Sequence, residues 1–319
     1  MAARWGLSPI SPSGIASVGR RCATLLNVVG DCQRSTGSRV TIEVAAATEA
    51  AEEAGRLLLE AFVGPGGGAA GPGRSHRNGP HDVVTALDAR SERLIARRLR
   101  AAFPDDGFVG EEHRPRPGRG RGGLQRTWIV DPIDGTVMFA SGIPFFSISI
   151  ALAVDSQVIL GVVHDPVHHE TFRAVRGAGA ESVSGVNGRA GRAARRLRLR
   201  RLAEAADAVI SLDPGDPDDP AARSRIEGLR PRARVARSFG STALSLAWLA
   251  AGRLDGVLQV HGLQAVDIAA GGLIALEAGA RVTDASGGPW LDLADLAHGR
   301  GIAAAGRTVH RMLLASSSP

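Results

Sequence analysis

The sequence predicts a layered α/β protein built from two halves, residues 41–190 and 191–319. The first half places helical patterns ahead of a run of consecutive strand patterns. The second half alternates strand and helix patterns along the chain. Helices followed by neighbouring strands favour helices packed on an antiparallel sheet, whereas regular alternation favours an α/β layer. Taken together, these patterns predict an α/β fold with α+β layering.

Two amphipathic helices are expected at the start of the first half. Apolar residues recur at helical spacing from Thr41 to Val63, and Gly64-Pro65 ends the pattern. The same spacing returns from Ala86 to Phe103, directly before a proline. Residues 64–80 are rich in Gly and Pro, and residues 113–123 are rich in Arg, Pro and Gly. Both compositions are typical of loops.

Strand patterns follow these helices. Apolar and β-branched residues dominate four segments: Thr127–Val130, Phe145–Val154, Gln157–Val163 and Glu170–Val175. Short turns separate the last three segments, which predicts an antiparallel meander.

The second half changes period repeatedly. Strands are expected at Ala208–Ser211, Ala233–Arg237 and Gly256–Val260, and helices at Pro220–Leu229, Ser241–Ala251 and Asp267–Ala278. This order predicts that the helices of this half cover a sheet of its own.

Residues 1–40 differ in composition from the rest of the chain. They contain five arginines, many Ser and Gly residues, and the single acid Asp31. We expect a disordered or non-native extension, such as translation from an upstream start codon. A targeting segment remains the alternative, although no clear apolar core and cleavage site are present.

The composition argues against several classes of protein. No run of about 18 apolar residues occurs, so we expect no membrane span. All 38 basic residues are arginine, which indicates a coding bias rather than a nucleic-acid partner, despite a net charge of +6. Two cysteines in 319 residues form no disulfide framework, and we expect a cytoplasmic protein.

Acidic clusters stand at the ends of apolar segments. They are Glu111-Glu112, Asp131 with Asp134, and Asp267. Carboxylates held close together repel one another, and a hard divalent cation relieves this repulsion. Magnesium prefers a few carboxylates together with water and phosphate oxygens. Each cluster alone also fits a solvated surface or, at Asp267, a helix N-cap.

The clusters resemble a known family when they are read with their neighbours. The segments are Asp82–Asp88 (DVVTALD), Gly110–Glu112 (GEE), Trp128–Thr136 (WIVDPIDGT) and Asp267–Gly271 (DIAAG). From about residue 41 to 310 the chain resembles the inositol monophosphatase family of magnesium-dependent, lithium-sensitive phosphatases. The resemblance implies an alternating αβαβα sandwich of the sugar-phosphatase type and, by analogy with the family, a homodimer.

The resemblance also implies roles for individual residues. One Mg²⁺ would bind Glu111, Asp131 and the backbone carbonyl of Ile133, and a second would bind Asp131, Asp134 and Asp267. Glu111 and Thr136 would orient the attacking water, with Asp88 and Thr85 supporting them. The implied substrate-binding residues are Asp134, Gly135, Thr136, Gly240, Ser241, Thr242, Gln259 and Asp267.

The implied reaction is hydrolysis of a small-molecule phosphate ester by metal-activated water, with inositol monophosphate or a similar polyol phosphate as the substrate. Met138 and Val266 stand where the family often has Asn and Trp, and Gln259 stands where many inositol phosphatases have a carboxylate. Histidinol phosphate and nucleotide 3′-phosphates therefore remain alternatives. A metal-binding scaffold with weakened catalysis is the alternative outside the enzyme class.

Three histidines, His164, His168 and His169, surround Asp165-Pro166. We expect them on an exposed turn between two strands rather than in a metal site.

Overall fold

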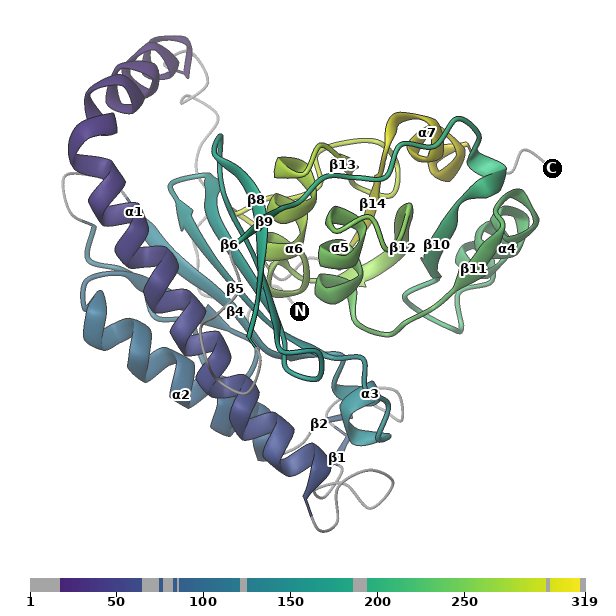
Figure 1. The fold of residues 1–319 in the computed structure, drawn as a ribbon, viewed down its shortest axis with the longest axis horizontal. Helices are drawn as coiled ribbons and strands as arrows, with labels where there is room; N and C mark the ends of the chain where they lie inside the picture. The colour runs from purple at the N-terminus through teal and green to yellow at the C-terminus, as the bar shows by residue number, and fades with distance from the viewer. Residues whose placement is uncertain are drawn as a thin grey trace. The chain divides into compact units, whose positions relative to one another are not determined.

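The computed structural model describes residues 18–64, 75–76, 83–84, 86–120, 125–185, 194–296 and 299–315 (Figure 1). The chain divides into two compact units, residues 1–46 and 47–319, and the fold below is that of the second unit. The expected boundary between the two halves, at residues 190 and 191, lies outside the described residues.

A seven-stranded sheet forms the first layer of strands. Its order is β3-β4-β5-β6-β7-β8-β9, and every pair is antiparallel except β3 with β4. The predicted meander is present as three consecutive strands that match the expected segments closely. The strands are β3 (Gly107–Gly110), β4 (Arg126–Asp134), β5 (Ser147–Val154), β6 (Gln157–Asp165), β7 (Glu170–Val175), β8 (Gly179–Ser184) and β9 (Arg195–Arg196).

A five-stranded sheet forms the second layer of strands, in the order β11-β10-β12-β14-β13. The strands are β10 (Val209–Asp213), β11 (Val235–Arg237), β12 (Gly256–Leu263), β13 (Arg281–Thr283) and β14 (Arg300–Ala305). Strand β10 is parallel to both its neighbours, whereas β14 is antiparallel to β12 and β13. The sheet is therefore mixed, and the sequence pattern predicted only its first three strands.

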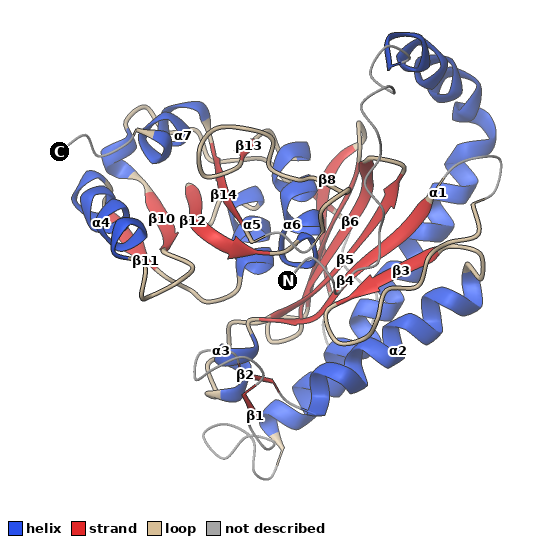
Figure 2. Cartoon of the chain, turned by 180° about the vertical axis from the view of Figure 1, so that it is seen from behind, coloured by secondary structure: helices blue, strands red, loops and turns tan. Residues whose placement is uncertain are grey.

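Two helices lie between the sheets, as Figures 1 and 2 show. They are α5 (Thr242–Ala250) and α6 (Ala265–Glu277). Ala270 and Ile274 of α6 belong to the core shared with the first sheet, and Ile268 belongs to the core shared with the second. At Gly161 of β6 a Cβ atom would lie 2.7 Å from the Ala270 carbonyl oxygen, so glycine permits this close approach.

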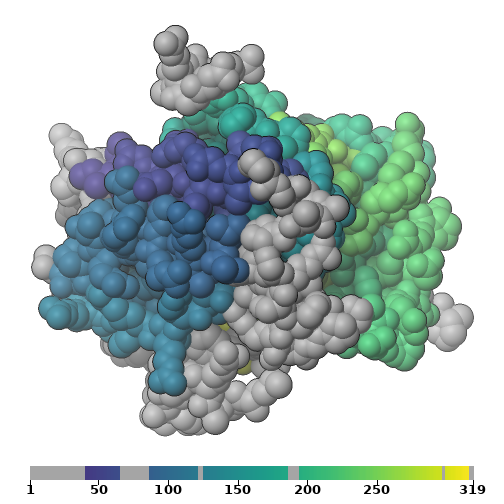
Figure 3. Space-filling model, turned by 90° about the horizontal axis from the view of Figure 1, so that it is seen from below, coloured from purple at the N-terminus to yellow at the C-terminus, as the bar shows by residue number. Residues whose placement is uncertain are grey.

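The outer faces of both sheets carry helices. The first sheet is covered by α2 (Ala86–Ala102) and by residues 47–63 of α1 (Val18–Val63), which lie together in blue and purple in Figure 3. Phe62 of α1 packs against Phe146 with ring centroids 5.1 Å apart. The second sheet is covered by α4 (Pro220–Leu229) and α7 (Arg307–Leu314).

The layer order confirms the predicted αβαβα sandwich, with α1 and α2, the first sheet, α5 and α6, the second sheet, and α4 and α7 in succession. Helix α1 begins well before residue 41, where the amphipathic pattern starts. The remaining described elements are short: β1 (Ser75–His76), β2 (Val83–Val84), α3 (Thr136–Ala140) and two 3₁₀ turns, Ala205–Asp207 and Arg230–Arg232. None of the helices described here has an apolar stretch long enough to cross a membrane.

Candidate active site

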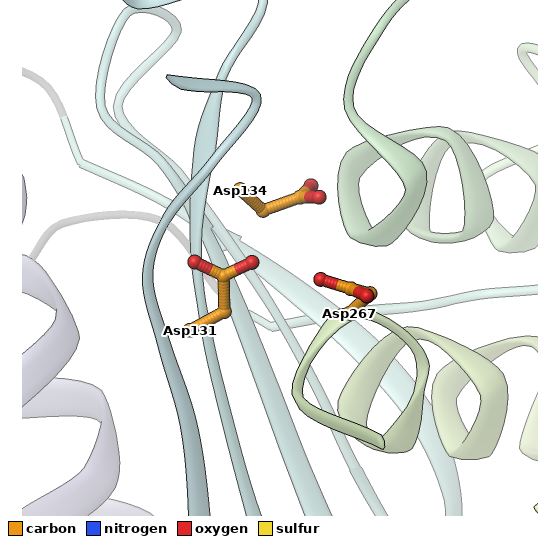
Figure 4. A group of neighbouring side chains, drawn as sticks. All are labelled: Asp131, Asp134 and Asp267. Carbon is orange, nitrogen blue, oxygen red and sulfur yellow. The ribbon is translucent and has the colours of Figure 1, made fainter. Parts of the chain in front are cut away.

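The end of β4 carries the first two acids of the site. Asp131 is opposite Ser149 and Asp134 is opposite Ser147, and the pairing register shifts between them. Proline at position 132 has no N–H to give to the ladder, which fits an irregular strand at this point. The Ile133 N–H instead donates to Asp131 Oδ1 at 2.9 Å. The strand therefore ends in a tight turn that brings Asp131 and Asp134 close to Asp267 of α6 (Figure 4).

The third acid, Asp267, lies in the first turn of α6. Its Oδ2 accepts a hydrogen bond from the Gln264 N–H at 2.6 Å, which forms half of a capping box. One of its carboxylate oxygens lies within 4.8 Å of an Asp131 carboxylate oxygen. The helix begins at Ala265 with Gln264 as its N-cap, so the interpretation of Asp267 as an N-cap was wrong; Asp267 is the third residue of the helix and combines the capping-box contact with a place in the acidic site.

Asp131, Asp134 and Asp267 converge although they are far apart in the sequence. Each offers a carboxylate oxygen, and these three oxygens lie within 4.8 Å of one another (Figure 4). Asp131 and Asp134 are buried, with 2% and 5% of their surface exposed. Among the residues that the structure describes, this is the one group of three or more acidic, histidine or cysteine side chains close enough to share a metal ion.

The electrostatics of this acidic trio are unfavourable for three separate negative charges. Burial raises the pKa of Asp131 well above its usual value, and the charges of Glu111, Asp134 and Asp267 raise it further. Burial likewise raises the pKa of Asp267 to about 7, with a contribution from the charge of Asp134. A cation would compensate both the burial and the mutual repulsion.

Asp134 is held by the N-terminus of α5. Its carboxylate accepts hydrogen bonds from the hydroxyls of Ser147 and Ser241. It also accepts the backbone N–H groups of residues 242, 243 and 244 at 3.1, 2.9 and 3.3 Å. Burial raises the pKa of Asp134, and these hydrogen bonds oppose that rise because they favour the charged form. The carboxylate is consequently fixed in one orientation.

Gly135 makes the turn after Asp134 possible. Its φ of 95° is in the left-handed region that favours glycine. A Cβ atom there would lie 3.0 Å from Ser241 Cβ and 3.1 Å from the Phe145 carbonyl oxygen. The chain can therefore reverse directly into α3 and place Thr136 beside the acids.

Thr136 connects the turn to α2. Its hydroxyl lies 3.1 Å from Asp88 Oδ1 and 2.9 Å from the Ile133 carbonyl oxygen. Asp88 is 1% exposed. The predicted supporting residue Thr85 lies outside the described residues.

Glu111 follows β3 and is partly exposed. It is not in the trio of mutually close carboxylates, yet it is near enough for its charge to raise the pKa of Asp131. Glu111 therefore lies near the acidic trio but has no carboxylate oxygen grouped with those of the trio. Its role as a metal ligand stays a prediction.

The expected substrate-binding residues lie beside Asp134. Thr242, whose N–H contacts Asp134, donates its hydroxyl to Gln259 Oε1 at 2.7 Å. Gln259 is on β12, opposite Asp213 of β10. A small cavity here is lined by Ser211, Asp213, Gly240, Ser241, Thr242, Ser245, Val257, Leu258 and Gln259.

Some residues of the site were not found from the sequence. Ser147 contacts Asp134 from the start of β5, and Ser149 donates to the Val266 carbonyl oxygen at 3.2 Å. Two serines that alternate with isoleucine in an otherwise apolar strand were the available signal. Burial of a polar side chain requires a partner, and the partner here comes from another part of the chain.

The expectation of an exposed histidine turn was wrong for His164. It is 6% exposed, and its Nδ1 lies 2.9 Å from the Thr171 hydroxyl. Burial lowers the pKa of His164 to about 3, and the positive charges of His169 and Arg56 lower it as well. The pattern around positions 164–169 did not show that α1 covers this end of β6.

The chain is similar to known proteins over most of its length. The sequence model of the inositol monophosphatase family matches residues 41–318. The chain is 37% identical over 233 residues to Nus factor SuhB of Pasteurella multocida, covering 73% of this chain and 82% of that protein. It is 36% identical over 236 residues to inositol-1-monophosphatase of Mesorhizobium japonicum, covering 74% and 83%.

A solved structure has the same fold. The extragenic suppressor protein suhB from Bartonella henselae superposes with a TM-score of 0.71 at 33% identity, covering 85% of this chain and 96% of that one. The family match, the two relatives and the shared fold extend over most of the chain. The protein therefore belongs to the inositol monophosphatase family and is a phosphoric monoester hydrolase.

Proposed function

We propose that this chain is a Mg²⁺-dependent phosphatase for inositol monophosphate or a similar small polyol phosphate. The observation that carries the proposal is the trio of Asp131, Asp134 and Asp267, whose oxygens lie within 4.8 Å of one another beside the Thr136–Asp88 pair. Asp131 and Asp134 are buried and Asp267 is half-buried. Carboxylates gathered in this way are costly without a compensating charge.

The donor set fits magnesium. Hard carboxylate and carbonyl oxygens are the ligands that Mg²⁺ prefers, together with water and phosphate oxygens. In this proposal Glu111, Asp131 and the Ile133 carbonyl hold one ion, and Asp131, Asp134 and Asp267 hold the other. Bound cations supply positive charge to phosphoryl oxygens and make a nearby water easier to deprotonate.

The protein's own groups then orient water and substrate. Thr136 has one hydroxyl proton, and it lies within reach of both Asp88 and the Ile133 carbonyl. With that proton engaged, its oxygen can accept a hydrogen bond from an attacking water. In this proposal Glu111, whose charge acts on Asp131, is a second acceptor for that water. The water oxygen bonds to phosphorus, the ester P–O bond breaks, and the alcohol leaves with a proton.

Neutral polar side chains lie beside Asp134, where a polyol would bind in this proposal. The small cavity there has room for little more than a water molecule and is lined by hydroxyls, the Gln259 amide and the Asp213 carboxylate, together with the apolar Val257 and Leu258. Gln259 offers both a donor and an acceptor to hydroxyls. The relative in Mesorhizobium japonicum carries the name inositol-1-monophosphatase, which supports the same substrate class.

A panel of phosphomonoesters tests the proposal. Phosphate release from inositol 1-phosphate, histidinol phosphate and a nucleotide 3′-phosphate would be measured with Mg²⁺ and with EDTA, beside an Asp134→Asn variant. We expect Mg²⁺-dependent release with inositol 1-phosphate preferred, and a loss of at least about 100-fold in the variant, since Asp134 is both a ligand and a helix-capping group.

Each other outcome has a clear meaning. Preference for histidinol phosphate or the nucleotide contradicts the polyol assignment alone. Absence of phosphate release from every ester contradicts the proposal that the chain is an active enzyme and favours the scaffold alternative.

The family resemblance also leads us to propose a cytoplasmic homodimer, and light scattering after size-exclusion chromatography would measure the oligomeric state.

A further inference from the structure

One face of α2 carries three buried polar side chains. Asp88, Ser91 and Glu92 are spaced as i, i+3 and i+4, so they lie on the same side of the helix. They are 1%, 0% and 0% exposed. Buried polar groups need partners, and all three find theirs in the two chain segments that carry predicted metal ligands.

Glu92 holds the segment that contains Glu111. Its Oε2 accepts the N–H of Glu112 at 2.7 Å, and its Oε1 accepts the N–H of His113 at 3.0 Å. The His113 ring nitrogen Nδ1 lies 2.6 Å from the same Oε1. The backbone on the C-terminal side of Glu111 is therefore fixed by one carboxylate.

Gly110 fixes the other side of Glu111. A Cβ atom at Gly110 would collide with the Glu92 carboxylate, so only glycine allows this close approach. The carboxylate thus packs directly on the last residue of β3 and bonds to the two residues after Glu111.

Ser91 holds the other segment. Its hydroxyl donates to the Pro132 carbonyl oxygen at 3.1 Å, within the turn between Asp131 and Asp134. Asp88 accepts from Thr136 at the end of the same turn. Glu111 and the Asp131–Asp134 turn are consequently both tied to a single rigid helix.

We infer that Ser91 and Glu92 are positioning residues that set the separation of Glu111 from Asp131, and so the affinity of the metal site that these two acids share. This inference rests on the proposed function. Residues that orient metal ligands commonly change metal affinity 10–100-fold when they are replaced. A role limited to folding would lower stability and leave metal affinity unchanged.

Two variants and a matched control test the inference. Glu92→Gln replaces one acceptor oxygen with a donor that cannot accept a backbone N–H, and Ser91→Ala removes the bond to Pro132. Asp106→Asn is the control, because Asp106 is also a buried carboxylate bonded to β4, through Trp128 Nε1 at 3.1 Å and Arg126 Nε at 3.1 Å. It precedes β3, at the opposite end of that strand from Glu111.

The measurements are Mg²⁺ and Mn²⁺ dissociation constants by calorimetry, the Mn²⁺ electron paramagnetic resonance spectrum, melting temperature, and kcat against metal concentration. We expect Glu92→Gln to weaken metal binding at least about 10-fold. Ser91→Ala should weaken it several-fold, and kcat should recover in both at saturating metal. Asp106→Asn should lower the melting temperature while keeping the dissociation constant of the wild type.

The results separate this inference from the proposed function. If the wild type binds no Mg²⁺ or Mn²⁺, the proposed function fails and this inference fails with it. If the wild type binds metal and both variants bind it equally well, only the positioning role is overturned. Should Glu92→Gln not fold, unchanged metal affinity in Ser91→Ala would still overturn it.

Discussion

Asp134 shows how one side chain can serve both the fold and the site. Its carboxylate closes the N-terminus of α5 through three backbone N–H groups and also faces Asp131 and Asp267. Helix N-termini favour a negative charge, so these hydrogen bonds oppose the rise in the pKa of Asp134 that burial causes. Asp131 and Asp267 each accept one backbone N–H, from Ile133 and Gln264, and burial raises the pKa of Asp267 to about 7. Because carboxylates bind a metal ion in their deprotonated form, a divalent cation at this site would shift the three acids toward the charged form.

His164 leads to a prediction about acid stability. Its pKa is about 3 when folded, against an ordinary value of about 6.5. Below pH 6.5 the unfolded chain binds a proton that the folded chain refuses, so stability falls as the pH falls from about 6.5 to 3. At pH 5 this linkage costs about 2 kcal/mol relative to pH 7. Urea unfolding at both pH values would measure it.

The control for this prediction is His164→Gln, which keeps a polar contact toward Thr171 but does not titrate. We expect the difference in unfolding free energy between pH 7 and pH 5 to be about 2 kcal/mol smaller in the variant. An identical pH dependence in both proteins would show that His164 does not carry the acid sensitivity.

At the scale of elements, helices pack closely on the sheets where one of the two contacting residues is glycine or alanine. Gly55 of α1 lies against the His164 ring, and Gly161 of β6 lies against the backbone of α6. In both places a helix approaches a strand more closely than a Cβ atom would permit. The alanine-rich α6 continues this pattern, since Ala269, Ala270 and Ala275 are fully buried. Because α6 packs so closely on the first sheet, the first turns of α5 and α6 lie beside the acids at the end of β4.

Gly55→Ala should therefore destabilise the protein even though alanine is the better helix former. By propensity alone the change would stabilise a helix by about 1 kcal/mol. The added methyl group overlaps the His164 ring, and overpacking of this kind costs about 1–3 kcal/mol. We expect a net loss of about 1 kcal/mol in chemical unfolding.

Gly185→Ala is the matched control for this substitution. A Cβ atom at Gly185 meets nothing within 4 Å, and its φ is outside the left-handed region. We expect its unfolding free energy to stay within about 0.5 kcal/mol of the wild type. Equal stability of Gly55→Ala and the wild type would mean that α1 moves away without cost.

At the scale of the whole molecule, the acidic site joins the two cores. Asp131 and Asp134 come from the first sheet, while Asp267 begins a helix that packs on both sheets. A ligand that bridges these residues stabilises only the folded arrangement. Metal binding should consequently be visible in global unfolding.

We expect Mg²⁺ at about 100 times its dissociation constant to stabilise the wild type by about 2.7 kcal/mol. Asp131→Asn should lose this gain. Without metal, the variant should melt at or above the temperature of the wild type, because it removes one of three repelling carboxylates. Thermal unfolding with Mg²⁺ and with EDTA would measure both effects. An equal Mg²⁺ shift in the two proteins would place the binding site elsewhere.

Local patterns predicted most of the fold. The expected strand at 170–175 and the expected helix at 220–229 match β7 and α4 at both ends, because their apolar period is interrupted by clear turn residues. Strand β14 and helix α7 were not predicted. The Gly- and Ala-rich run that forms β14 has little strand character of its own. This run is a strand because it is buried between β12 and β13.

The residues of the candidate site also fall into those that the sequence could predict and those that it could not. Asp131, Asp134 and Asp267 could be predicted, since their residue types and neighbours carry the pattern. The contacts of Ser147 and Glu92 could not, because their partners lie 13 and 20 positions away, and the alternation of serine with isoleucine marks Ser147 as notable without naming its partner.

By itself, the sequence determined the α/β class, most of the longer helices and strands, and the three acids, because hydrophobic period, turn chemistry and charge are local properties. The αβαβα order of layers came from the family resemblance of its motifs. Only the tertiary structure decided which oxygens meet, which acids have raised pKa values and how α2 ties two ligand segments together. Those outcomes depend on burial and on contacts between distant residues, and desolvation has no value until the chain has packed.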